Sequence, residues 1–317
     1  MFDILAIISP IYIAILAGYA ATRMGLFSKA DMRVFGKFVI NFALPALIFN
    51  AISQRPIAEV LNAGYMAAYL GGSLLSMALG FLCARRLAGL DHVGSTFAAM
   101  GVSCSNSGYI GLPILLLTMP ALASVALAMN VIIENVVMIP LLLMMAESGR
   151  EGAGPAHRVF FQTAARVARM PLVLGLAAGL AMSLLGWSLP AALARSVTLF
   201  AQATGALSLF VIGGTLVGLP LRGMGPGVLA IAIGKLVGHP LAVLGVASAL
   251  SWVGIAPPGP ALLAAGVVMA AVPMLGIYPI LAQAHGLADR SAAALLVTTA
   301  LSFLTLSTGL WLLRAHA

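Results

Sequence analysis

The sequence predicts an all-α polytopic membrane protein, with ten transmembrane helices in a 5+5 inverted repeat and two broken helices, the fourth and the ninth, that cross. Three observations support this fold class. The chain is 62% hydrophobic and 8% charged, whereas about a quarter of the residues in a soluble domain are charged. It contains ten apolar segments near the roughly 20 residues that a helix needs to cross a bilayer. Two of these segments are interrupted by glycine and proline, one in each half of the chain.

The apolar segments are joined by mostly short connections, and each is expected to form one membrane-spanning helix. The first begins after Met1-Phe2-Asp3, which is not a basic n-region, so we expect a retained helix and not a cleaved signal peptide. In order, the expected spans are residues 4–22, 32–53, 59–84, 94–118, 121–146, 170–188, 194–219, 226–252, 260–284 and 291–313.

Positive charge predicts the orientation of these spans. Most of the 16 Lys and Arg residues lie in or beside the connections that follow odd-numbered spans, whereas Arg55, Arg195 and Arg314 lie on the other side. Cytoplasmic loops carry an excess of Lys and Arg. We therefore expect a multi-pass protein of the cytoplasmic (inner) membrane, with both termini on the periplasmic or extracellular side.

The two halves of the chain resemble each other in two places. Residues 10–20 are similar to residues 171–181, and the two interrupted segments match in the same order. This predicts a first five-helix repeat over 1–150 and a second over 170–317, inverted because five is an odd number. In the linker, 151–169, four polar side chains share one helical face, which predicts an interfacial amphipathic helix. It serves either as a topology anchor or as a docking surface for lipid or a partner.

The interrupted segments, 105–115 and 271–281, are the candidate substrate site. Proline removes a backbone N–H and disturbs the turn before it, and every backbone group in lipid needs a partner. Paired breaks therefore favour a shared binding site, where half-helix N-termini would attract a carboxylate; the alternative is two ordinary proline kinks. The candidate substrate-binding residues are Asn106, Ser107, Tyr109, Gly111, Pro113, Pro273, Gly276, Tyr278 and Pro279.

Ionisable residues within the spans are candidates for ion or proton coupling. Glu134 lies midway along the fifth span, with Asn130 one α-helical turn away. An intramembrane carboxylate is expensive and indicates function, so Glu134 either carries a coupling proton or is a structural partner of Lys235. Lys235 in turn could pair with Glu134, act as a fixed cation near the crossing, or snorkel to the cytoplasmic face.

The sequence contains no pattern typical of an enzyme. It has no His/Cys/Asp/Glu cluster with metal-ligand spacing, no phosphate-binding loop and no nucleophile elbow, so we expect no metal, cofactor or catalytic residue. The function expected is secondary active transport of a small organic anion. The alternatives are a non-transporting sensor or partner subunit and a passive anion channel. Expected partners are the substrate and the bilayer, with a proton or sodium ion and a second copy of the chain as further candidates, and no nucleic acid.

Along essentially its whole length the sequence resembles the auxin efflux carrier family, whose bacterial members include malonate and other organic-anion transporters. The fourth span carries the more specific part of the likeness, in Asn106, Gly111 and Pro113. The ninth span is similar to the family's Gly-Ile-x-Pro at residues 276–279, and the opening stretch, 10–49, to its first two helices.

The resemblance implies a ten-helix inverted repeat similar to bile-acid symporters and sodium/proton antiporters. It implies that spans 1, 2, 6 and 7 form a scaffold and that the others form a unit that moves as an elevator. The substrate, a carboxylate such as malonate or an auxin-like acid, would bind near Asn106. The chain differs from the plant carriers in its short central loop and in the spacing of Pro273 and Pro279.

Overall fold

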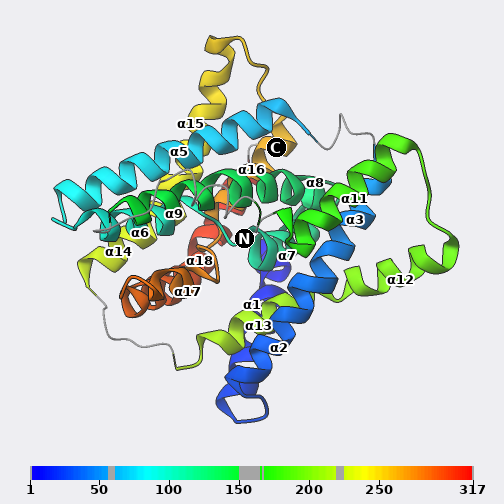
Figure 1. Cartoon of the computed structure of the whole chain (residues 1–317), viewed down its shortest axis with the longest axis horizontal. Helices are drawn as coiled ribbons and strands as arrows, with labels where there is room; N and C mark the ends of the chain where they lie inside the picture. Colours follow the sequence, from blue (N-terminus) through cyan, green and yellow to red (C-terminus); the bar gives the residue numbers. More distant parts are fainter. Residues whose placement is uncertain (1, 56–60, 150–164, 166–167, 219–224, 316–317) are drawn as a thin grey trace. The chain divides into compact units, whose positions relative to one another are not determined.

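The computed structural model describes residues 2–55, 61–149, 165, 168–218 and 225–315. Helices make up nearly all of this described part, in which no strand occurs (Figure 1). In chain order the elements are α1 (Phe2–Arg23), α2 (Lys29–Phe38), η1 (Val39–Ala43), α3 (Leu44–Ser53), α5 (Ala63–Arg86), α6 (His92–Ser103), η2 (Ser107–Gly111), α7 (Leu112–Thr118), α8 (Pro120–Val131), η3 (Ile132–Met138), α9 (Ile139–Ser148), α11 (Pro171–Leu185), α12 (Ala191–Gln202), α13 (Thr204–Leu216), α14 (Pro226–Ile233), η4 (Gly234–Gly238), α15 (His239–Ala249), η5 (Leu250–Val253), α16 (Pro260–Ala271), α17 (Tyr278–Gln283) and α18 (Ala288–Ala315).

The structure confirms an all-helical protein of the polytopic membrane type. Six continuous helical segments are long and apolar enough to cross a membrane, and three shorter apolar helices accompany them among the described residues. Helical structure is present in each of the ten apolar segments, but ten crossings, the inverted repeat and the crossing of the fourth and ninth helices stay predictions. The amphipathic helix predicted in the linker lies almost entirely outside the described residues.

The helices pack into two compact units. Unit 1 comprises Met1–Asn62, Ser107–Val131 and Ala168–Gly218, and unit 2 comprises Ala63–Asn106, Ile132–Val167 and Leu219–Ala317. Predicted spans 1, 2, 6 and 7 therefore fall in unit 1, spans 3, 8, 9 and 10 in unit 2, and spans 4 and 5 are divided. Because each unit takes segments from both halves of the sequence, the packing units cut across the predicted repeats, and those repeats stay a prediction.

Glycines allow two helices of unit 1 to approach closely. α1 packs against α13 (Figure 1). A Cβ atom at Gly18 would collide with the carbonyl oxygen of Phe210, and one at Gly213 with that of Ile15. Small residues at such contacts let helix backbones touch where lipid supplies no hydrophobic driving force. Elsewhere in unit 1, α3 packs against α11, and in unit 2 α5 packs against α6 and α15.

Four helices contain a π-helical segment just before a proline. η1, η2, η3 and η4 each end two residues before Pro45, Pro113, Pro140 and Pro240, respectively. A proline ring clashes with the carbonyl one turn back, and a widened turn makes room for it. Such π segments are common at functional sites. Three of the four π segments contain a candidate substrate-binding or coupling residue: Ser107 in η2, Glu134 in η3 and Lys235 in η4.

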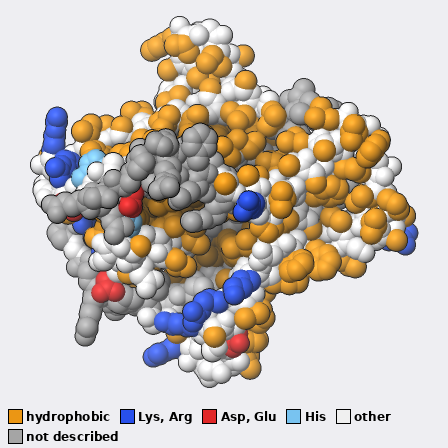
Figure 2. Space-filling view, in the orientation of Figure 1, with side chains coloured by type: hydrophobic (Ala, Val, Ile, Leu, Met, Phe, Trp, Pro, Cys, Tyr) orange, Lys and Arg blue, Asp and Glu red, His pale blue; other side chains and the backbone are white. Residues whose placement is uncertain are grey.

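The surface is apolar over large areas. Figure 2 shows many hydrophobic side chains on the face in view, with Lys and Arg gathered in a few places. Large exposed hydrophobic residues include Leu16, Leu229 and Leu241. Soluble monomers rarely expose large contiguous apolar patches, and the many exposed hydrophobic residues fit helices that face lipid.

Candidate functional site

The two interrupted segments contact each other inside unit 2. α6 ends at Ser103 and α16 at Ala271, and the residues after each helix are extended. Ser105 and Met274 form an isolated antiparallel bridge, and the Asn106 N–H donates to the carbonyl of Pro273 at 2.8 Å. Each break thus supplies partners for backbone groups exposed by the other, as the interior of a membrane protein requires.

Pro273 explains why the second break opens where it does. The residue before a proline is pushed out of the α region, and Val272 accordingly adopts φ −72° and ψ 159°. The last carbonyls of α16 are left without a following turn to bind them. α6 reaches the same place and ends in the extended Cys104. The negative ends of two helix dipoles therefore meet beside the bridge.

Lys235 places a positive charge at this junction. Its side chain is fully buried in η4, its Nζ donates to Ser105 Oγ at 2.8 Å, and it also donates to the Ala270 carbonyl at the end of α16. The same Nζ lies 3.1 Å from Nδ1 of His239, whose Nε2 is 2.9 Å from Ser73 Oγ. The role of a fixed cation stays a prediction. These contacts contradict the snorkelling alternative, because the ammonium is held inside unit 2 and does not reach the surface.

Glu134 approaches Ser105 from a different helix. Its Oε1 accepts a hydrogen bond from the Ser105 N–H at 3.2 Å and lies 3.1 Å from the Tyr69 hydroxyl. That hydroxyl is also 3.1 Å from Ser105 Oγ. Both Glu134 and Lys235 are buried, and both contact Ser105. Glu134 and Lys235 have opposite formal charges and share Ser105. Gain or loss of one proton by either residue therefore changes the net charge of the site.

The residues of the first break have different environments. Asn106 is buried in unit 2, next to the bridge, whereas Ser107 accepts a hydrogen bond from Asn130 Nδ2 at 3.2 Å within unit 1. The Tyr109 hydroxyl donates to the carbonyl of Gly36 in α2 at 3.0 Å. Gly111 and Pro113, also buried, end η2 and begin α7. The structure thus links Asn130 to the break, as a partner of Ser107.

The residues of the second break make contacts within unit 2. The Tyr278 hydroxyl, predicted to contact substrate, donates to the carbonyl of Phe97 in α6 at 2.8 Å, and the side chain is buried. Pro273 contributes the carbonyl that binds Asn106. Gly276 and Pro279 are half-buried, before and in the first turn of α17. This break therefore contributes backbone and helix anchoring.

Sequence reasoning did not single out two central residues, Ser105 and Tyr69, as part of the site. Ser105 stood in the first break as one of several polar groups, and its contacts come from residues 29 and 130 positions away. Tyr69 carries a weak signal, because Tyr69, Ser73 and Ser76 form a polar stripe on one face of the apolar α5. All three side chains are buried.

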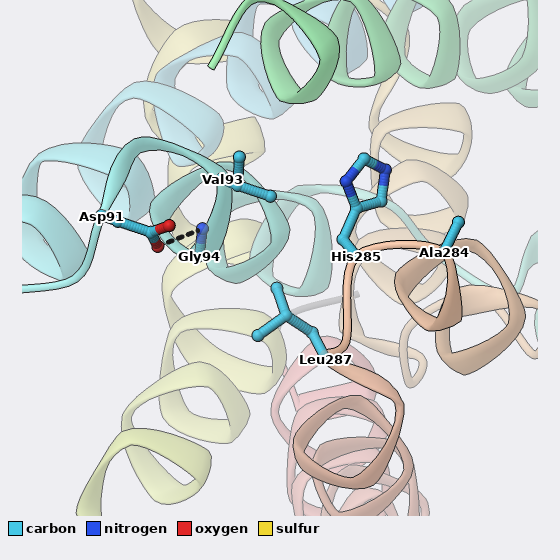
Figure 3. A pocket seen from close by; sticks show the side chains of 6 residues that line it. All are labelled: Asp91, Val93, Gly94, Ala284, His285 and Leu287. Carbon is cyan, nitrogen blue, oxygen red and sulfur yellow. Dashed lines mark hydrogen bonds between the residues drawn. The ribbon is translucent and has the colours of Figure 1, made fainter. Parts of the chain in front are cut away.

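A separate hollow of about 310 Å³ lies at the far end of α6 (Figure 3). It is lined by Asp91, Val93, Gly94, Ala284, His285 and Leu287. Asp91 caps α6 by accepting from the Gly94 N–H at 2.8 Å, and the His285 ring lies 4.9 Å from that of Phe97. Since α6 has 12 residues, about 18 Å of helix at 1.5 Å per residue separates this hollow from the junction at Ser105. In the described part of the chain, no group of three or more His, Cys, Asp or Glu could hold a metal ion.

Comparison with known proteins identifies the family. The family described as membrane transport protein matches residues 3–312. The chain belongs to this family. It is the auxin efflux carrier family that the motifs at Asn106 and Pro279 resemble. The match covers both interrupted segments and every residue of the junction.

Individual relatives of this membrane transport protein carry transporter names. A protein of Rhizobium meliloti (strain 1021) named "Putative malonate transporter" is 29% identical over 324 residues, covering 100% of this chain and 98% of that protein. A protein of Escherichia coli (strain K12) named "Uncharacterized transporter YfdV" is 26% identical over 218 residues, covering 65% of this chain and 67% of that protein. An uncharacterized transporter of Methanothermobacter thermautotrophicus is 26% identical over 105 residues, 33% of this chain and 34% of its own.

Proposed function

We propose that this membrane transport protein is a secondary active transporter of small organic anions, carboxylates such as malonate or auxin-like acids, in the cytoplasmic membrane. The observation that carries the proposal is the buried Lys235 ammonium at the junction of two interrupted segments. A buried ammonium has a high desolvation cost. A role in binding or moving charged species across the membrane explains why Lys235 is placed at the end of α16. The likeness to a protein named as a malonate transporter supports this substrate class.

The first break offers a carboxylate a favourable position. A helix of Ser107–Thr118 begins directly after Asn106, and its first N–H groups carry partial positive charge. Half-helix N-termini bind substrate carboxylates in other transporters with broken helices. Asn106 adds an amide that can donate to an anionic oxygen. We place the substrate carboxylate here, with Ser107, Gly111 and Pro113 shaping the turn that receives it.

Lys235 and Glu134 supply the coupling in this proposal. In other such transporters, the C-terminal ends of half-helices and unwound carbonyls coordinate a sodium ion or proton. Here the Lys235 ammonium is bound to the Ala270 carbonyl and Ser105, where such a sodium ion would sit. The lysine therefore takes the place of a sodium ion, and Glu134 is the group that gains and loses a coupling proton.

Alternating access follows an elevator-type mechanism in which spans 3, 4, 5, 8, 9 and 10 move relative to a scaffold of spans 1, 2, 6 and 7. Unit 2 contains the junction, with Ser105, Glu134 and Lys235, so these groups move together as one body and keep their contacts. Spans 1, 2, 6 and 7 in unit 1 are the scaffold. Ten crossings, with both termini on the periplasmic side, give the orientation expected from the charge distribution.

Replacement of Asn106 tests the substrate site. In proteoliposomes, Asn106→Ala should reduce exchange of labelled malonate by roughly 10–100-fold, since each hydrogen bond to a charged group contributes about 1.5–3 kcal/mol. The control is Asn41→Ala, because Asn41 is exposed and its amide donates to the Lys37 carbonyl of its own helix. Full exchange activity in Asn106→Ala, with wild-type reconstitution, would contradict the assignment.

A further inference from the structure

Two buried hydroxyl groups of unit 1 lack a hydrogen-bond partner. Thr204 and Ser208 are both 0% exposed, and neither Thr204 Oγ1 nor Ser208 Oγ has a partner within the described residues. They lie four residues apart at the start of α13 and so share one face of that helix. A buried hydroxyl without a partner is unfavourable, which makes a pair of them on one face unusual.

The default arrangement for such a pair occurs elsewhere in the same chain. Thr298 and Ser302 in α18 have the same four-residue spacing and are also fully enclosed, at 0% and 1% exposure. Their hydroxyls donate to carbonyls of their own helix, Thr298 to Ala294 and Ser302 to Thr299, both at 2.7 Å. Serine and threonine in spanning helices commonly bond this way. The Ser208 hydroxyl has no partner although the Thr204 carbonyl lies one turn back in α13, whereas Thr204 is the first residue of α13 and the carbonyls one turn before it belong to α12.

The face that carries these hydroxyls lies toward the first break. Val211 continues the face three residues after Ser208, and α13 packs against α2 and η2. Val211 Cγ1 and the Tyr109 hydroxyl are both 3.6 Å from where a Cβ atom on Gly36 would lie. The opposite face of α13, with Gly213, packs against α1. Three residues beyond Ser208, this face of α13 thus lies near Tyr109 of η2, the segment whose Ser107 binds Asn130.

The elements packed against α13 include α2, which carries Lys29, Asp31, Arg33 and Lys37, and none of these four side chains is buried. The sequences of η2, α7 and α13 contain no Asp, Glu, Lys, Arg or His. Hydroxyl and amide groups without a nearby cation bind neutral oxygen atoms well and do not offset a full negative charge. A ligand group suited to this place is a hydroxyl or a protonated carboxyl.

We propose that Thr204 and Ser208 form a hydroxyl subsite for the second oxygen-bearing group of the transported acid, bound in its uncharged form. This inference rests on the proposed function and specifies its substrate class: acids with a second carboxyl or hydroxyl group are preferred over acids with a single carboxyl. The substrate crosses with one negative charge, which lies at the first break. The side chains are enclosed in the present conformation, so the ligand reaches them when η2 separates from α13.

The first test compares two acids in proteoliposomes. Thr204→Val/Ser208→Ala should raise the KM for labelled malonate roughly tenfold, the effect of losing hydrogen bonds to the ligand, and leave exchange of labelled propionate within about twofold. The matched control, Thr298→Val/Ser302→Ala, should leave the KM of both acids unchanged. An unchanged malonate KM, or an equal loss for both acids, would overturn the subsite.

If the wild type transports neither acid, the proposed function fails and the first test cannot be made. A second test then examines the subsite without a transport measurement. Ser208→Cys is made in a Cys83→Ala/Cys104→Ala background and treated with a small charged methanethiosulfonate reagent. A site that receives a water-borne ligand must become reachable from water, so modification of Ser208→Cys is expected, with Ser302→Cys unmodified. No modification of Ser208→Cys would overturn the subsite independently of any transport measurement.

Discussion

Replacing Lys235 with methionine is expected to abolish transport and to destabilise the protein. The ammonium donates to the Ala270 carbonyl and the Ser105 hydroxyl, and the buried Glu134 accepts from the N–H of the same Ser105. Removing one partner of a buried charged pair typically costs about 3–5 kcal/mol. We therefore expect malonate exchange to fall by roughly a hundredfold or more and the melting temperature to fall by roughly 10 °C.

Two further variants separate the charge effect from loss of packing. Lys37→Met removes an exposed lysine and should change neither exchange nor melting temperature. The double variant Lys235→Met/Glu134→Gln removes both charges, and its melting temperature should recover most of the loss while transport stays absent, because the uncompensated carboxylate is gone. If Lys235→Met exchanges malonate at the wild-type rate, the lysine does not take the place of a coupling sodium ion.

Glu134→Gln is expected to separate exchange from proton-driven transport. The glutamine oxygen can still accept from the Ser105 N–H and the Tyr69 hydroxyl, so the junction keeps its hydrogen bonds but has no group that titrates. Malonate uptake driven by a pH gradient should fall to the rate seen without a gradient. Exchange of labelled for unlabelled malonate, which needs no net proton movement, should persist.

The matched control for Glu134 is Glu147→Gln, at the end of α9. It should respond to a pH gradient as the wild type does. If Glu134→Gln also keeps the wild-type pH dependence, Glu134 is not the proton carrier, and its contacts with Ser105 and Tyr69 are structural.

Features that rest on composition or on backbone chemistry could be predicted from the sequence. The membrane class follows from the scarcity of charge, and the second break follows from Pro273. The first break opens at residues 104–106, whereas Pro113 lies in the helix that follows it. The bridge between Ser105 and Met274 shows that the two interrupted segments meet at their breaks. Glu134 and Lys235 were identifiable because an ionisable group in an apolar segment is exceptional.

Features that depend on long-range packing or on irregular helix geometry could not be predicted from the sequence. Asn130 and Glu134 are four residues apart, but η3 replaces regular α-helix at Glu134, so this spacing does not correspond to one α-helical turn. Tyr278 was expected to contact substrate because it stands in the second break, yet its hydroxyl is engaged by Phe97. The partners of Ser105 come from three other helices, and no local pattern indicates them.

The measurement that tests the central claim most directly is uptake of labelled malonate by the wild-type protein in proteoliposomes under a pH gradient, a sodium gradient and neither. Lys235 is already bound where a coupling sodium ion would sit, and Glu134 can carry a proton. We therefore predict saturable uptake that the pH gradient accelerates and that sodium leaves unchanged. Uptake that requires sodium, or no saturable uptake under any of the three conditions, would contradict the account.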